Sequence, residues 1–442
     1  MSYAPIFFAR FRNRESEAGS WQNRPSLRSV MVACGCLALI LPGALPAPAQ
    51  EALHNSLAGD AAAQARIVQA ESLPYTLKSG DFKLLVIPSL GLDWNDNINI
   101  SKTNALQDFI LSPRTEFDAS YPVTHNNLLS LNFVAGYDNY FEHPSYSTWF
   151  LQSGSGLSFD IYVKDFWFNL HDQASYVQDA AQNAALSGTG TYAIINNKAG
   201  LSVTWDLNQL TLSSGYDHQN IISTTSQFDS QNSAAELVFA KAGLQVYPGV
   251  TTGVEGTAAF TTYEQEVLNN NDAYTAGVYA NWQPGSYFSL QAQGGYAVYL
   301  FQHTSQSIQT SDLNSWYCGL NITHQPTDAI SYTLAAGHEV QLGIQSDAIE
   351  DWYVRPSIEW NIIKNVTLHT SFSYENGNQG VGNVAGNLTE NFNWLGSEVG
   401  VSYSILKKLS LGLHYRLTLR SSSIANDAYT QDVVGLTLTY QP

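Results

Sequence analysis

Apolar and polar residues alternate along most of the chain from residue 81 onward, in segments of about ten to fifteen residues. The last segment reads VVGLTLTY over residues 433–440, and residues 409–420 read LSLGLHYRLTLR. Successive side chains of a strand point to opposite faces. Each segment therefore predicts a β-strand with one apolar face and one polar face, and the chain belongs to the all-β class.

Eighteen such segments can be counted between residue 81 and the end of the chain. They predict a transmembrane antiparallel β-barrel of 18 strands, with 16 as the alternative because the segment near residue 241 is weak. Bacterial barrels have even strand numbers, short turns at one end and longer loops at the other. An even number also places both termini at the same end, which we expect to face the periplasm.

The connections between the segments alternate between short and long. Short ones such as 164–165 and 207–209 predict periplasmic turns, and long ones such as 178–197 predict outer loops. The segment 178–197 is the longest and the third of the long loops, and it is almost free of charge. Two interpretations stay open for it: the loop folds into the lumen and narrows the pore, or it lies outside the barrel.

The composition supports a membrane barrel over a soluble or helical protein. Charged residues make up 13% of the chain, about half of the usual share, and aromatic residues 12%. No apolar run after residue 49 is long enough for a membrane-spanning helix. Ten aromatic residues lie near the predicted strand ends, where membrane interfaces favour them: Trp94, Tyr121, Tyr140, Trp149, Trp167, Trp205, Trp282, Trp316, Trp352 and Trp360.

The first 49 residues have the organisation of a secretory signal peptide, with five arginines, an apolar stretch and the small residues Ala47 to Ala49 before the expected cut. Residues 50–80 form a short periplasmic N-terminal segment, too short for a plug domain, and residues 81–442 form the barrel. Cys318 is the only cysteine that follows the signal, so no disulfide within the exported chain is expected.

The exported part is strongly acidic, with 14 basic and 35 acidic residues after the signal. This charge excludes nucleic acid as a partner. The expected location is the outer membrane of a Gram-negative bacterium. The expected partners are outer-membrane lipid and lipopolysaccharide, the barrel-assembly machinery and, in the case of an export role, periplasmic export components. No cofactor is expected.

Ionisable residues occur at inward positions of the predicted strands. These candidate lumen charges are Arg114, Glu116, Asp118, Glu255, Glu339, Arg355, Glu359, Glu398, His414 and Arg416. Charges across a water-filled pore filter solutes by their sign. The alternative is that the same residues pair with one another and brace the wall. The sequence contains no catalytic, metal-binding or phosphate-binding motif, and we expect no enzymatic activity.

Residues 80–98, GDFKLLVIPSLGLDWNDNI, end in a Trp followed by the pair Asp96-Asn97. This segment resembles the opening of the β-barrel porin type 2 family, and the likeness extends loosely to residue 442. The resemblance implies an outer-membrane channel for passive passage of hydrophilic solutes. The alternatives are the barrel of a polysaccharide export system, because some family members are thought to have that role, and a structural or adhesive surface barrel with a closed lumen. The resemblance implies no catalytic residue.

Overall fold

The computed structural model describes residues 74–442 except 125–126, 178, 304–309, 345 and 381–388. The predicted signal peptide and residues 50–73 therefore lie outside the described residues. None of the helices in the described ranges is long and apolar enough to cross a membrane.

Strands dominate the described part of the chain. They are β1 (Leu77–Ser79), β2 (Phe82–Asn95), β3 (Asp108–Pro122), β4 (Leu128–Tyr140), β5 (Thr148–Val163), β6 (Phe166–Val177), β7 (Ile194–Leu207), β8 (Leu210–Ser223), β9 (Ser233–Tyr247), β10 (Val250–Tyr263), β11 (Asn270–Gly285), β12 (Phe288–Gln302), β13 (Leu313–Thr327), β14 (Ile330–Leu342), β15 (Ala348–Ile363), β16 (Val366–Gln379), β17 (Glu390–Leu406), β18 (Leu409–Ser422) and β19 (Tyr429–Tyr440). Three short 3-10 helices lie in the described parts of the loops: η1 (Pro144–Tyr146), η2 (Ala180–Gln182) and η3 (Ser226–Gln231).

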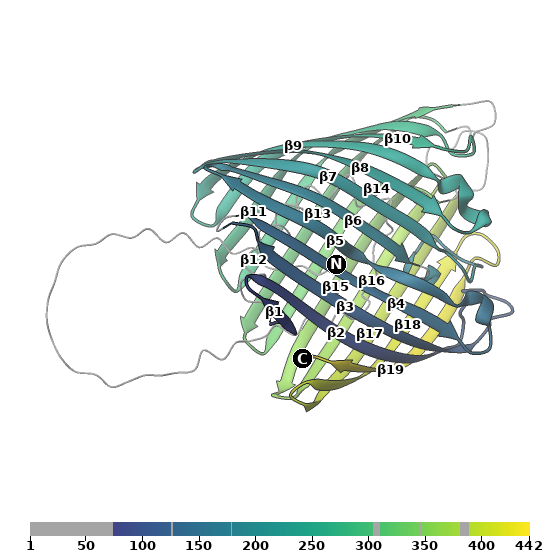
Figure 1. The fold of residues 1–442 in the computed structure, drawn as a ribbon. Coiled ribbons are helices and arrows are strands. Elements are labelled where there is room, and N and C mark those ends of the chain that lie inside the picture. Colours follow the sequence, from purple (N-terminus) through teal and green to yellow (C-terminus); the bar gives the residue numbers. More distant parts are fainter. Residues whose placement is uncertain (1–73, 125–126, 178, 304–309, 345, 381–388) are drawn as a thin grey trace, which may run out of the picture.

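Strands β2 to β19 form one closed antiparallel barrel (Figure 1). Each strand pairs with the next along the chain, and β19 pairs with β2 from Val433↔Asn95 to Thr439↔Ser89. The short β1 pairs with β2. The prediction of 18 barrel strands is confirmed, and the weak segment near residue 241 is strand β9. Closure satisfies the hydrogen-bonding groups of every strand edge, which a sheet in lipid requires.

One face of the barrel wall is apolar and exposed. On β18, Leu411, Leu413 and Tyr415 are 39%, 53% and 42% exposed, whereas His414 and Arg416 alternate with them and point inward. The same alternation recurs on the other long strands. A continuous exposed apolar surface of this extent is not found on soluble monomers and is typical of a wall that faces lipid.

Most aromatic residues that were expected at the membrane interface lie on this outward face. Trp149, Trp205 and Trp316 are among the large exposed side chains of the outer surface. The expectation is wrong for Tyr140 and Trp167, whose side chains point inward. Tyr140 lies on the same face of β4 as Asp138 and pairs with the buried Ile110 of β3. Trp167 is buried and donates a hydrogen bond from Nε1 to Asp160 on β5. Its neighbours Phe166 and Phe168 occupy the outward positions of β6, so the alternation places Trp167 inside.

Short turns lie at one end of the barrel and long connections at the other (Figure 1). The turn between β9 and β10 requires glycine: Gly249 has φ +77°, and a Cβ there would lie 2.3 Å from the Gln283 carbonyl oxygen. The C-terminus and β1 lie at the end with the short turns. At the other end, the connections 141–147 and 423–428 add to the long loops that the sequence predicted.

Candidate functional site

All ten candidate lumen charges lie on the inward face of barrel strands. The apolar positions that alternate with them are exposed on the outside, for example Pro113 beside Arg114 and Val399 beside Glu398. The structure does not arrange the ten charges in one ring. It distributes them among separate groups along the wall.

Arg114, Glu398, His414 and Arg416 belong to one group on β3, β17 and β18. Glu398 lies opposite Arg416 in the strand register. Asp93 on β2 joins them: its Oδ1 is 3.4 Å from His414 Nε2, and it interacts electrostatically with Arg416 and Arg114. Positive and negative side chains therefore face the lumen side by side on neighbouring strands, and we call this set the β18 charge group.

A second group lies on β14, β15 and β16. The Arg355 guanidinium binds Glu375, with Nη2 2.6 Å and Nε 3.1 Å from Oε1. Glu339 and Asp351 lie opposite each other in the register and both interact electrostatically with Arg355. Glu359 lies further along β15, opposite His369. The close Arg355 contact supports the interpretation of wall bracing for this group.

The other candidates lie apart from these groups. Glu116 and Asp118 are inward neighbours on β3, and Asp118 accepts a hydrogen bond from Asn132 on β4. Glu255 on β10 accepts a hydrogen bond of 3.3 Å from the Tyr317 hydroxyl. Among the described residues, no three His, Cys, Asp or Glu side chains are placed to hold a metal ion.

The third long loop, residues 179–193, crosses the interior of the barrel. It leaves β6, yet Asp179 Oδ2 is 3.1 Å from Arg416 Nη2 and the Ala184 carbonyl accepts a hydrogen bond of 2.8 Å from Arg420 Nε. Both arginines point inward from β18. Strands β19, β2, β3, β4 and β5 separate β18 from β6 in the wall, so the loop reaches β18 through the lumen. The sequence left two interpretations open for this loop. The structure agrees with the one in which the loop folds into the lumen and narrows the pore.

Arg420 is the main polar anchor of this loop. It is 3% exposed, and its Nη2 lies 2.7 Å from Glu390 Oε1 on β17. Its Nη1 donates a hydrogen bond of 2.6 Å to the Asp427 carbonyl in the loop before β19. One buried guanidinium thus connects the third loop, the last loop and two strands.

Apolar packing holds the same loop in place. Leu186 is 1% exposed and lies in a buried cluster with Ile100, Phe228 of η3 and Trp394 of β17. Tyr192 packs edge-on against Phe228 with ring centroids 4.9 Å apart. Full burial of a leucine side chain contributes about 1.5–3 kcal/mol. The loop is therefore a packed constriction.

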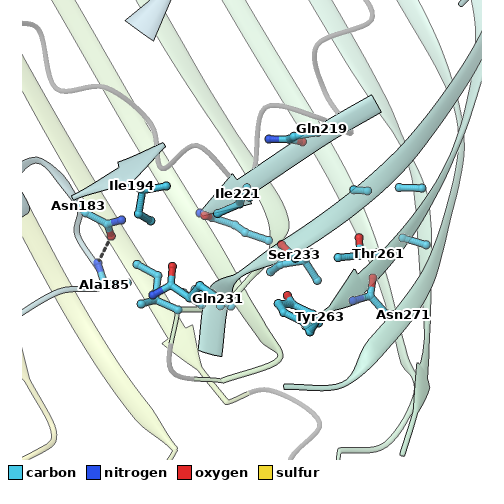
Figure 2. A pocket seen from close by; sticks show the side chains of 18 of the residues that line it. Asn183, Ala185, Ile194, Gln219, Ile221, Gln231, Ser233, Thr261, Tyr263 and Asn271 are labelled. Carbon is cyan, nitrogen blue, oxygen red and sulfur yellow. Dashed lines mark hydrogen bonds between the residues drawn. The ribbon is translucent and has the colours of Figure 1, made fainter. Parts of the chain in front are cut away.

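A cavity remains beside the loop, against β8 to β11 and the connection from β14 to β15 (Figure 2). Its empty space is about 840 Å³, including the part open to solvent. None of the described residues that line it is acidic or basic. Burial raises the pKa of the Tyr192 hydroxyl above its usual range, so this group stays protonated and donates to Gln231 Oε1 at 2.9 Å.

Sequence reasoning missed several residues of this region. Asp93 lies at an inward position of β2, between the outward residues Leu92 and Trp94. The alternation of side chains along this strand could have identified it. Asp179 and the loop residues that meet Arg420 carry no local signal, because their partners lie more than 230 residues away.

Comparison with known proteins gives structural likeness only. No protein-family model and no curated protein matches the chain. Among solved structures, Pseudomonas aeruginosa OccK5 (OpdH) is 12% identical, with 82% of this chain and 98% of that chain covered and a TM-score of 0.45. A BenF-like porin from Pseudomonas fluorescens Pf-5 is 11% identical, with 81% and 99% covered and a TM-score of 0.46. At these values the likeness indicates nothing about the solute of this chain.

Proposed function

We propose that this chain is an outer-membrane channel for the passive passage of small hydrophilic solutes. A closed barrel with an apolar outside and a polar, charged inside suits a water-filled path through lipid. The apolar positions of β18 and the inward charges that alternate with them support this division.

The observation that carries the proposal is the path of residues 179–193 across the lumen. A loop anchored at Arg416 and Arg420 on the far wall narrows the interior, while the cavity beside it leaves space. A barrel with a narrowed interior suits small solutes better than a polymer. This geometry therefore favours a porin-like channel over polysaccharide export.

In this proposal, some of the ten candidate lumen charges filter passing ions and others brace the barrel wall. The β18 charge group lies where the loop meets the wall, because Arg416 belongs to both. Fixed charges at a constriction act on passing ions more strongly than charges in a wide lumen. Arg355, bound to Glu375, is better placed to brace the wall.

The same proposal fixes the orientation of the chain. The short turns, β1 and the C-terminus would face the periplasm, and the long loops would face outward, in contact with lipopolysaccharide. A signal sequence at residues 1–49 and the barrel-assembly machinery would bring the chain to the membrane.

A structural barrel with a closed lumen is the second candidate, and one observation favours it. A second buried cluster lines the inside of β9 to β15, including Leu237, Tyr299 and Phe301. If this cluster and the third loop together fill the lumen, no solute passes.

Single-channel recording distinguishes the two candidates. The protein is expressed in a Gram-negative host, purified from the outer-membrane fraction and reconstituted in a planar bilayer, with heat-modifiable gel migration as the control for folding. The channel proposal predicts steady conductance. A correctly folded barrel that carries no current would contradict it and support the structural role.

A further inference from the structure

Three amide side chains line the cavity beside the third loop, at different points along it. Asn183 comes from the loop itself, Gln231 from the end of η3 and Asn271 from β11 (Figure 2). They are 7%, 7% and 1% exposed. Each has one end of its amide in use and the other end free.

The used ends fix the orientation of each amide. Gln231 Oε1 accepts from the Tyr192 hydroxyl at 2.9 Å, and Asn183 Oδ1 accepts from the Ala185 N–H at 3.0 Å. Asn271 Nδ2 donates to the Asn269 carbonyl at 3.3 Å. An amide offers a donating NH₂ and an accepting oxygen. The free ends are therefore two donors and one acceptor.

These free ends have no hydrogen-bond partner within the described part of the chain. They are Gln231 Nε2, Asn183 Nδ2 and Asn271 Oδ1, and all three atoms are buried. Buried polar atoms without a partner are rare in folded proteins, because their desolvation is not compensated. A bound molecule with both donor and acceptor groups would supply a partner to each free end that it reaches.

The remaining lining narrows the chemistry of that molecule. Apolar side chains such as Ile194, Ile221 and Ile349 line the same cavity, together with Tyr263. In a strongly acidic chain, this cavity has no acidic or basic residue among its described lining. A charged solute would lose its hydration here without an opposite charge in return. The cavity therefore suits a neutral molecule with hydroxyl groups and an apolar C–H surface.

We propose that this cavity is a binding site for a neutral sugar, to which Asn183, Gln231 and Asn271 offer hydrogen bonds at successive points on its way through the channel. Sugar hydroxyls both donate and accept, which the two free donors and one free acceptor require. The transport role rests on the proposed channel function, whereas binding itself does not.

Saturation-transfer NMR on the full barrel in detergent micelles tests binding without any need for conductance. The probes are glucose and sucrose, with glucuronate as the charged counterpart. The variants Gln231→Leu and Asn271→Leu each remove one hydrogen-bonding end and keep the approximate size. Gln293→Leu is the control, because Gln293 faces inward on β12 and does not line the cavity.

The proposal predicts a saturable signal for a neutral sugar and a weaker one for glucuronate. Loss of one hydrogen bond should weaken apparent affinity about three- to tenfold in Gln231→Leu and Asn271→Leu, with little change in Gln293→Leu. Absent binding, equal binding of glucuronate, or unchanged affinity in both cavity variants would overturn it. If a sugar binds but the protein carries no current in a planar bilayer, the binding site is supported and the channel function is contradicted.

Discussion

Truncation of Leu186 should loosen the constriction without disturbing the barrel. The side chain is 1% exposed inside the cluster that seats the third loop. Replacing a buried leucine with alanine costs about 2–5 kcal/mol. A loss of about 3 kcal/mol lowers the ratio of seated to unseated loop about 100-fold. The strands keep their pairing, because Leu186 lies outside the sheet.

Single-channel recording detects this change directly. Wild-type protein should hold one main conductance, and Leu186→Ala should visit additional, larger conductance levels as the loop leaves the lumen. Leu413→Ala is the matched control, because Leu413 is an outward residue of β18 that is 53% exposed. If folded Leu186→Ala gives traces like those of wild type, the loop does not set the width of the path.

Three further predictions address the anchor, the charges and the outer face. Arg420→Leu should leave Glu390 buried without its partner and cost about 3–5 kcal/mol, seen as a lower temperature of the heat-induced gel shift. Arg114→Ala combined with Arg416→Ala removes two positive charges beside acidic neighbours and should shift reversal potentials in a salt gradient toward cations; unchanged potentials would count against these residues as filters. Leu413→Arg should destabilise insertion by about 2–4 kcal/mol in vesicle folding assays if this face meets lipid.

The barrel could be predicted from the sequence because the alternation of residues carries both the strand and its face. Leu411, Leu413 and Tyr415 point outward in the structure as their spacing requires. The alternation of short and long connections likewise predicted that the turns lie at one end of the barrel and the long loops at the other. Strand β9 was the weakest prediction because the small residues Ala240 and Ala242 dilute its outward apolar face, while its inward face is also partly apolar at Leu237. Closeness to a turn is not enough to place an aromatic residue at the membrane interface. Trp167 lies near a turn, but the alternation of side chains along β6 places it inside the barrel.

The path of the third loop could not be derived from local pattern. Asp179 meets Arg416 and Ala184 meets Arg420 only after the barrel has closed, and no periodicity links positions so far apart. The uncharged, Ala-rich composition of the loop was the available signal for an inward path, because burial of such residues costs little desolvation free energy. The free ends of Asn183, Gln231 and Asn271 depend on contacts that only the folded chain provides.

Solute permeation with and without the loop tests the central claim most directly. Liposomes containing wild-type protein, or a variant with residues 180–191 replaced by a short Gly-Ser linker, are exposed to neutral solutes of increasing size. A loop-narrowed channel predicts that wild type admits only the small solutes and that the variant also admits larger ones. An identical size limit for both folded proteins, or no permeation through either, would contradict it.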